Sequence, residues 1–275
     1  MGVRPVVAVV DGEPGSPNGN MRSRRFIGTG TLQVLDPFLM LSYFQADRDG
    51  GGFPDHPHRG FETVTYMLAG RMHHGDSHGN QGVIGPGGAQ WMTAARGIVH
   101  SEFPECIDSA MSGFQLWVNL PAARKMDPAS YQEVAATGVP VEQRTGATVR
   151  VVAGVTSQDT AGPLAAASTD ARLFEIRLDA GTEFSERVPP DHTVFLLLFD
   201  GELEFGNGET MATGAQLILL GPGEQVVARA GPAGAGFLLV AGRPLQEPVA
   251  WGGPFVMNTR EEVVQAYRDY QSGQF

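Results

Sequence analysis

The sequence predicts an all-β protein with two β-barrel domains and a short C-terminal helix. Glycine (37) and proline (19) are frequent among the 275 residues, so the chain turns often. Runs of β-branched and aromatic residues are short and closely spaced, as in barrels and sandwiches. The same pattern occurs in both halves, and the composition changes around residues 140–148. We therefore expect one barrel over residues 1–140 and a second over residues 141–275.

In the first half, a short apolar strand at residues 6–10 is followed by a polar loop that carries Arg22, Arg24 and Arg25. An isolated basic cluster in an acidic chain is typical of a solvated loop, and a position facing a pocket is the alternative. Further strands are expected at residues 63–68, 90–93, 98–102 and 114–120.

In the second half, the strands are expected at residues 149–155, 173–178, 193–199, 202–205, 216–220, 225–229 and 236–241. Asp200-Gly201 between two of them indicates a hairpin. The chain ends differently, because Thr259 and Glu262 form a capping box that predicts a helix starting at Arg260. Its apolar face would pack on the barrel.

The charge and the cysteine content restrict the partners and the compartment. The net charge is −11, with 19 basic and 30 acidic residues. Such a chain repels phosphates and anionic lipids, so we expect neither nucleic acid nor a membrane as a direct partner. A single cysteine, Cys106, allows no intrachain disulfide, and no apolar run approaches the ~20 residues of a membrane span. We expect a cytoplasmic protein.

Two short histidine motifs predict a metal centre in the first barrel. His56-Pro57-His58 and His100-Ser101-Glu102 each place two ligand types at positions i and i+2. Such side chains point to the same face of a strand, about 6.6 Å apart. If the two strands are neighbours, three imidazoles and one carboxylate converge. This donor set suits one divalent first-row metal such as Fe, Mn, Co, Ni, Cu or Zn.

The spacing leaves a second carboxylate open. Glu62 lies four residues after His58, so an unbroken strand would place it on the same face. Pro57 cannot donate a hydrogen bond to a sheet ladder, so we expect its strand to begin at an edge or a bulge.

The other candidate residues carry weaker signals. His73, His74 and His78 stand among turn-forming residues and are interpreted as a solvated turn whose backbone is satisfied by Asp76 and its neighbours.

Aromatic and polar residues around the centre are expected either in the core or at the mouth of the barrel. Trp91 and Trp117 are interpreted as core, and Phe53, Arg59 and Gln115 as candidates for the mouth of the metal barrel. In the second half, His192 has no ligating partner at the positions where a second pair would lie, so no metal is expected there.

Four stretches resemble the pirin family: residues 56–66, 90–102, 113–121 and 253–262. The resemblance extends from about residue 20 to the last residue. Pirins belong to the cupin superfamily, so the resemblance implies two jelly-roll-like cupin barrels with one metal in the first. Carried over by position, the ligands would be His56, His58, His100 and Glu102, which favours Glu102 over Glu62. Family members are typically iron proteins, so the resemblance implies Fe(II).

The resemblance also implies two different kinds of function. Some bacterial pirins cleave the flavonol quercetin with O2 and release carbon monoxide, which would make this chain a dioxygenase with Glu102 as a general base. Animal members act as transcriptional co-regulators, so a non-enzymatic, iron-dependent redox sensor with a protein partner is the alternative. A Zn- or Mn-dependent isomerase is a third hypothesis, because fold alone does not fix the chemistry.

Overall fold

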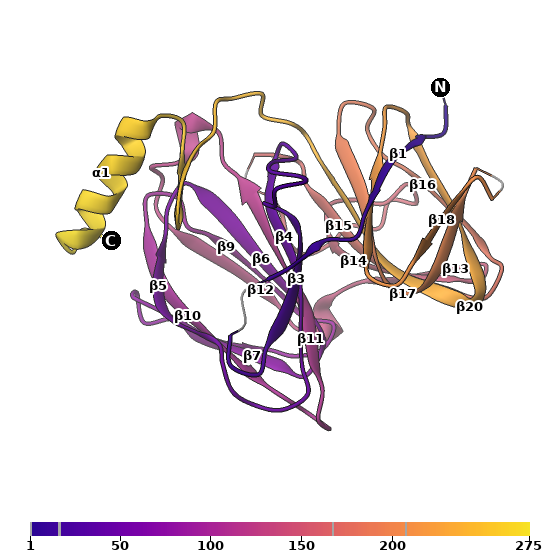
Figure 1. The fold of residues 1–275 in the computed structure, drawn as a ribbon, viewed down its shortest axis with the longest axis horizontal. Coiled ribbons are helices and arrows are strands. Elements are labelled where there is room, and N and C mark those ends of the chain that lie inside the picture. The colour runs from indigo at the N-terminus through magenta and orange to yellow at the C-terminus, as the bar shows by residue number, and fades with distance from the viewer. Residues whose placement is uncertain (1, 16–17, 167, 207) are drawn as a thin grey trace. The chain divides into compact units, whose positions relative to one another are not determined.

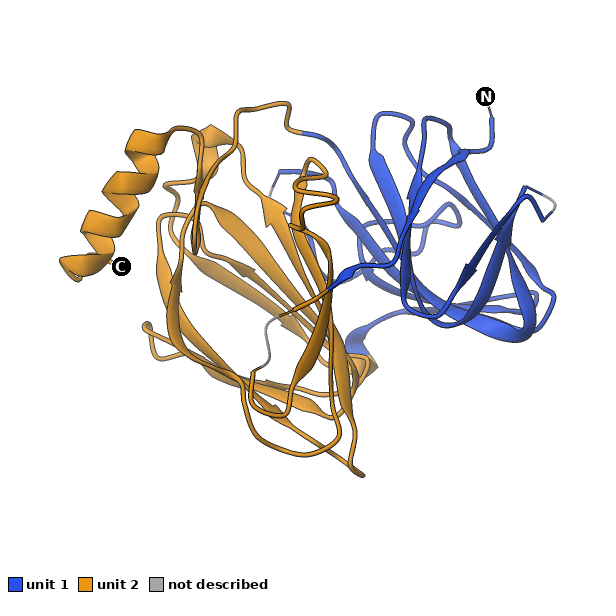
Figure 2. Ribbon diagram, in the orientation of Figure 1, with its two compact units in different colours: residues 1–13, 138–244 blue, residues 14–137, 245–275 orange. Residues whose placement is uncertain are grey.

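The computed structural model describes residues 2–15, 18–166, 168–206 and 208–275, and most of its regular structure is β-strand (Figure 1). Two compact units make up the chain (Figure 2). Unit 1 contains residues 1–13 and 138–244, and unit 2 contains residues 14–137 and 245–275. The units thus change over near the boundary expected at residue 140, but the two ends of the chain are exchanged. The first strand belongs with the second half of the chain, and the last 31 residues belong with the first half.

The two larger sheets of unit 2 have the strand orders β12-β9-β6-β11-β4-β3-β2 and β5-β10-β7-β8. Their bounds are β2 Glu13–Pro14, β3 Arg22–Ile27, β4 Phe38–Ala46, β5 Phe53–His58, β6 Phe61–Ala69, β7 Arg71–Asp76, β8 Gln81–Ile84, β9 Ala89–Thr93, β10 Ile98–Glu105, β11 Met111–Asn119 and β12 Ser130–Val134. Two short 3₁₀ turns follow at Ala122–Arg124 and Ala136–Gly138.

Apolar side chains join the two sheets of unit 2. Met72 of the smaller sheet packs in one cluster with Phe44, Met67 and Met111 of the larger sheet, and all four are at most 5% exposed. Burying such side chains contributes about 1.5–3 kcal/mol each. The predominantly β fold expected from the sequence is confirmed. The sheets are jelly-roll-like rather than closed barrels, since each described strand order ends in two edge strands.

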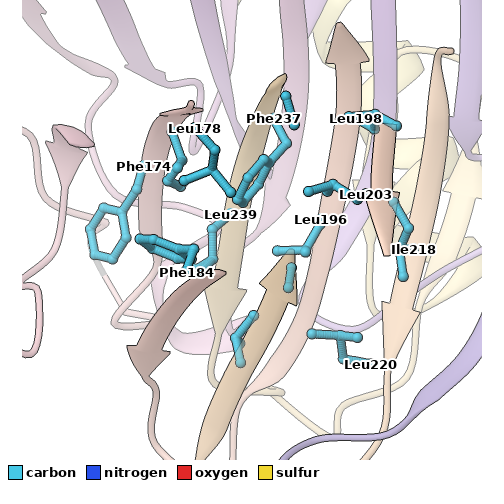
Figure 3. Packing of buried hydrophobic residues seen from close by; sticks show 14 of the residues in the cluster. Phe174, Leu178, Phe184, Leu196, Leu198, Leu203, Ile218, Leu220, Phe237 and Leu239 are labelled. Carbon is cyan, nitrogen blue, oxygen red and sulfur yellow. The ribbon is translucent and has the colours of Figure 1, made fainter. Parts of the chain in front are cut away.

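Unit 1 is built around one nine-stranded sheet in the described part of the chain, with β16 and β18 attached to the main path β1-β19-β17-β20-β15-β14-β13. The bounds are β1 Val6–Val10, β13 Val141–Arg144, β14 Ala147–Ala153, β15 Arg172–Leu178, β16 Glu183–Arg187, β17 Thr193–Phe205, β18 Thr210–Thr213, β19 Gln216–Leu220 and β20 Gln225–Gly242. Alternate residues of these strands form a buried core that includes Phe174, Leu196 and Phe237 (Figure 3).

The hairpin predicted at Asp200-Gly201 is wrong. The two expected strands are one strand, β17, whose register against β20 shifts between Leu198 and Asp200 and again between Gly201 and Leu203. Gly201 adopts a φ of +70° there, and a Cβ would collide with the carbonyl oxygen of Gly234. The Asp-Gly signal therefore marks a bulge that bends a long strand.

The C-terminal helix α1 (Arg260–Gln271) begins where the capping box predicts. The Thr259 side chain accepts from the backbone of Glu262, and the Glu262 side chain accepts from the backbone of Thr259. The helix packs on the β21–β22 hairpin (Ala250–Gly252 and Phe255–Met257). It therefore belongs to unit 2 rather than to the second half of the chain. No helix in the described part of the chain is long and apolar enough to cross a membrane.

A buried ion pair joins α1 to the turn between β5 and β6. Arg59 Nη1 donates to Asp269 Oδ2 at 2.6 Å, and the two side chains are 4% and 16% exposed. The same guanidinium lies 4.3 Å from the ring centre of Phe275. The hydrogen bond from Arg59, together with one from Gln265, holds the pKa of Asp269 below its ordinary value.

We expect Asp269→Asn to lower the free energy of unfolding at pH 7 by about 1–3 kcal/mol, because it leaves a buried guanidinium without its anion. The pKa of Asp269 is lower in the folded chain, so the pair stabilises the fold above the ordinary aspartate pKa, near about 4. This contribution is lost as the pH falls through the folded pKa. Urea unfolding at pH 7 and at pH 3 measures both effects.

Asp127→Asn is the matched control. Its partner is Arg124, and the two side chains are 40% and 45% exposed. The control should change the free energy of unfolding by less than about 0.5 kcal/mol. Equal losses in the two variants would contradict a special role for the buried pair.

Candidate metal centre

The pairing of β5 with β10 brings the two histidine motifs together. These strands are antiparallel, and His56 stands opposite His100. Ile98 stands opposite His58, and Pro57 lies between the two histidines of β5. β5 is an edge strand of the smaller sheet, so the missing N–H of Pro57 costs no ladder bond on its open side. The edge position predicted from Pro57 is confirmed.

Three imidazoles converge at this point. One ring nitrogen from each of His56, His58 and His100 lies within 4.8 Å of those from the other two. The ring centres are 4.3 to 5.0 Å apart. His58 and His100 are 4% and 2% exposed, whereas His56 is half-buried. The cluster therefore lies at the inner end of a depression that is open toward His56.

Burial keeps the two inner imidazoles neutral. Loss of solvation, followed by the nearby His100 and His56, lowers the pKa of His58 well below its usual range. Burial likewise lowers the pKa of His100 to about 4, against the opposing effect of Glu102. Neutral imidazoles keep a lone pair for a metal ion.

The hydrogen bonding of the rings also fits a metal. The Nδ1 atom of His56 lies 2.9 Å from the carbonyl oxygen of Pro54, which can only accept, so Nδ1 donates and Nε2 is the nitrogen left to bind a metal ion. Both ring nitrogens of His100 are buried without a hydrogen-bond partner among the described residues. A divalent ion would satisfy one such nitrogen of each ring, and three converging imidazoles suit a first-row metal.

Glu102 lies beside the histidines but outside this three-membered set. Glu102 is 3% exposed, and its carboxylate accepts hydrogen bonds from two residues. Gln115 Nε2 donates to Oε1 and Oε2 at 2.9 and 2.8 Å, and Thr65 Oγ1 donates to Oε1 at 3.2 Å. The carboxylate is therefore fixed at the edge of the cluster by a neutral amide and a hydroxyl.

Glu62, the other carboxylate left open by the spacing, lies elsewhere. It is fully buried on β6, opposite Thr93 of β9, and accepts a hydrogen bond of 2.8 Å from the Thr93 hydroxyl. It belongs neither to the histidine cluster nor to the cavity in front of it. Between His58 and Glu62 the chain turns at Arg59-Gly60, which breaks the continuous strand that the spacing argument assumed.

A cavity of about 160 Å³ opens in front of the histidines. Its walls come from the face of the larger sheet and from the strands that carry the motifs. The lining residues are Met21, Ser23, Arg25, Met40, Ser42, Phe44, Phe53, His56, His58, Met72, Glu102, Gln115 and Trp117. The cavity thus has an apolar body with a few polar groups, as small-molecule sites do.

Two of the three residues expected at the mouth line this cavity. Phe53 is 39% exposed at its edge, and Gln115 holds Glu102. Arg59 is not among the lining residues, because its guanidinium is engaged with Asp269 and the carbonyl of Arg96. Trp117, interpreted as core, is only half-buried and forms part of the wall, with its ring centre 5.1 Å from that of His58.

The wall residues that the sequence analysis missed follow a strict alternation. Residues 21, 23 and 25 face the cavity from β3 and the residue before it, and residues 40, 42 and 44 face it from β4. Side chains at i and i+2 share a face of a strand. The Arg22–Arg25 stretch is therefore a strand rather than the loop expected, and Arg25 takes the alternative position that faces a pocket. Period two would have separated Arg25 from Arg24.

The remaining histidines of unit 2 contact carboxylates or lie in a turn. His73 and His74 lie on β7 rather than in a turn, and their Nε2 atoms each lie 2.7 Å from a carboxylate, of Glu105 and Glu133 respectively. His78 is exposed in the turn that Asp76 closes by accepting from its backbone, as predicted.

In unit 1, His192 Nε2 lies 3.4 Å from Asp170 Oδ2. That this unit carries no metal stays a prediction.

Fold and site together define a two-domain cupin protein with a three-histidine centre in one domain. The Pirin family model matches residues 20–118, and the model of the pirin C-terminal cupin domain matches residues 173–275. The chain belongs to the pirin family, as the sequence motifs indicated.

Its bacterial relatives include one named as a pirin-like protein and one named as a candidate quercetin 2,3-dioxygenase. A pirin-like protein of Caulobacter vibrioides is 50% identical over 279 residues, covering 100% of both chains. A Pseudomonas aeruginosa protein designated a candidate quercetin 2,3-dioxygenase is 43% identical, covering 98% of this chain and 97% of that protein. The crystal structure of a quercetin 2,3-dioxygenase from Acinetobacter baumannii superposes with a TM-score of 0.89 at 29% identity, covering 100% of this chain and 99% of that chain.

We expect His100→Ala to reduce the affinity for a divalent metal by more than about 100-fold, because one of three converging imidazoles is lost. Metal content after dialysis, measured by inductively coupled plasma mass spectrometry, checks this. His78→Ala removes an exposed histidine outside the cluster and should keep the full metal content. Equal metal loss in both variants, or full occupancy in His100→Ala, would show that the cluster is not the binding site.

Proposed function

We propose that this protein is a metal-dependent dioxygenase of the quercetin 2,3-dioxygenase type, which opens a flavonol ring with O2 and releases carbon monoxide. The observation that carries the proposal is the cluster of three imidazoles at the inner end of a largely apolar cavity. The similarity to proteins designated as such dioxygenases supports it. The atoms balance, because both oxygen atoms of O2 enter the products as one ring carbon leaves as carbon monoxide.

His56, His58 and His100 would hold the ion, with Glu102 as the fourth ligand. Fe(II) is our first choice, and Mn, Co, Ni, Cu or Zn also suit these donors. Bound there, a divalent ion supplies a Lewis acid that favours the ionised form of a substrate hydroxyl. Purified protein can carry Ni, Cu or Zn whichever metal serves in the cell, because affinities follow the Irving–Williams order.

The residues of the chain have separate roles in this proposal. Glu102 accepts the proton of the substrate hydroxyl as a general base. Gln115 and Thr65 orient its carboxylate through the three hydrogen bonds described above. Phe53 and Trp117 pack against the ring of the substrate and exclude water.

The compartment and the exclusion of nucleic acid as a partner form a further part of the proposal. The single cysteine, Cys106, is free, which suits a reducing compartment, so we place the protein in the cytoplasm. The net charge of −11 argues against direct contact with nucleic acid.

Mutation distinguishes the roles of the two buried glutamates, Glu102 and Glu62. We expect Glu102→Gln to lower metal affinity by roughly 10–100-fold and to abolish turnover, because the anionic donor beside the histidines is lost. Glu62→Gln is the matched control with the same change in charge and shape, and it should leave metal affinity within about threefold, since Glu62 lies outside the cluster. Calorimetric titration with Mn(II) or Zn(II) measures both. The reverse ranking would assign the carboxylate role to Glu62.

Aerobic turnover of quercetin tests the reaction itself. Protein loaded with Fe(II), and in parallel with Mn, Co, Ni or Cu, should consume the flavonol absorbance and release one carbon monoxide per flavonol. His56→Ala should lose both activities together with the metal. Fully loaded protein that consumes no flavonol with any metal would overturn the dioxygenase proposal.

The size of the cavity favours one second candidate. Pockets for drug-sized ligands usually measure about 300–1,000 Å³, whereas this cavity measures about 160 Å³. A non-enzymatic, iron-dependent redox sensor that regulates a protein partner needs no space for a flavonol. In that case partner binding should change between Fe(II)- and Fe(III)-loaded protein while no substrate is consumed.

A further inference from the structure

We propose that the cavity selects a single aromatic ring that carries both a hydroxyl and a carboxylate, with Arg25 binding the carboxylate at the rim. The preferred ligand class is thus a hydroxylated aromatic acid, and a flavonol would place only one of its rings in the cavity. The inference rests on the proposed function only in taking the three histidines as a metal centre that binds the hydroxyl.

The volume of the cavity sets the size of the ring system. An apolar cavity of about 150 Å³ in another protein holds one benzene molecule. The cavity here, at about 160 Å³, has the same capacity. A flavonol has a fused two-ring system and a third ring, so most of it would remain outside. One ring is therefore the largest aromatic unit that the walls can enclose.

The walls suit a flat ring. Met40, Phe44 and Met72 are at most 5% exposed and form the apolar lining, and Trp117 adds a half-buried indole. Methionine side chains adapt to the shape of an aromatic ring and make favourable sulfur–aromatic contacts. The lining therefore favours an aromatic body over a sugar or an aliphatic acid.

Arg25 supplies the positive charge. Among the described residues that line the cavity it is the one arginine or lysine, and it is exposed at the rim. Arg22, on the opposite face of β3, pairs with Asp47 at 3.4 Å. No ion pair or hydrogen bond of the Arg25 guanidinium occurs among the described residues, so its five N–H donors can take a carboxylate in two parallel bonds.

The register of the sheet places the two ends of the ligand. Arg25 stands opposite Ser42, and Ser42 stands opposite Gln115, on neighbouring strands β3, β4 and β11 (Figure 1). Two strand spacings make about 10 Å. Gln115 contacts Glu102 beside the histidines. One ring with polar groups at its two ends can span this row from the histidines to Arg25.

The charges also fix the direction of the ligand. Glu102 lies at the inner end of the row and repels a second carboxylate, whereas Arg25 attracts it at the outer end. The hydroxyl end is thus directed to the histidines, where a metal stabilises its ionised form. A ligand without the carboxylate loses the outer contact but keeps the inner one.

The test compares two ligands that differ only in the carboxylate. Zn(II)-loaded protein, which consumes neither ligand, is titrated with 3,4-dihydroxybenzoate and with catechol by calorimetry. We expect the acid to bind roughly tenfold more tightly. Arg25→Met should reduce the affinity for the acid roughly five- to tenfold and leave that for catechol unchanged. Arg25→Lys should restore part of the loss, because the charge is kept without the planar fork.

Arg24→Met is the matched control, since it removes the same charge from the next position of β3, which does not line the cavity. Its affinities should equal those of the unchanged protein, and the zinc content of all variants should be the same. Equal affinity for acid and catechol, or an equal loss in Arg24→Met, would overturn the inference.

Quercetin turnover by the iron-loaded protein separates the two proposals. Turnover of quercetin without preference for the acid leaves the dioxygenase and removes the role of Arg25. Arg25-dependent binding of the acid without quercetin turnover leaves the anion site and removes the flavonol as substrate.

Discussion

The antiparallel pairing of β5 with β10 is the constraint on which the histidine cluster depends. His56 and His100 face each other across this pairing, and His58 follows on the same face of β5. A shift of one residue would turn every side chain of β5 to the other face and disperse the imidazoles. The register also shifts between His100 and Glu102, where Glu102 meets Phe53. This irregularity separates the carboxylate from the strict alternation, and it accompanies the hydrogen bonds that hold Glu102 toward Gln115 and Thr65.

The site stores an electrostatic cost that an ion would relieve. Buried imidazoles whose nitrogens lack partners, as in His100, are unfavourable in a protein interior. Protonation does not remove the cost, because burial holds the pKa of His100 at about 4. The carboxylate of Glu102 would compensate the charge of a divalent ion even though it lies outside the set of three converging imidazoles. The histidine cluster is thus prepared for a cation, and this preparation explains why so few polar groups suffice in an otherwise apolar cavity.

Short-range patterns in the sequence predicted the parts of the fold and site that local geometry controls. The shared face of His56 and His58 follows from strand periodicity, the edge position of Pro57 from its missing N–H, and the helix start from the capping box at Thr259. Long-range contacts set what was missed. Arg59 pairs with Asp269, 210 residues away, and does not line the cavity. Trp117 is half-buried and lines the wall. Arg25 was within reach of period-two reasoning, but its strand was interpreted as a loop.

The last residues of the chain belong to unit 2, and contacts beside the end of β5 give the physical reason. Directly after His58, the turn at Gly60 presents its carbonyl to Lys125, whose Nζ also donates to Asn119 and to the carbonyl of Val256 in β22. Lys125 is 1% exposed, so all three acceptors are needed to offset the burial of its ammonium group. β22 and the helix that follows it thus complete the hydrogen bonding around the turn that ends β5. The C-terminal segment therefore supports the position of His58, although none of its residues belongs to the histidine cluster.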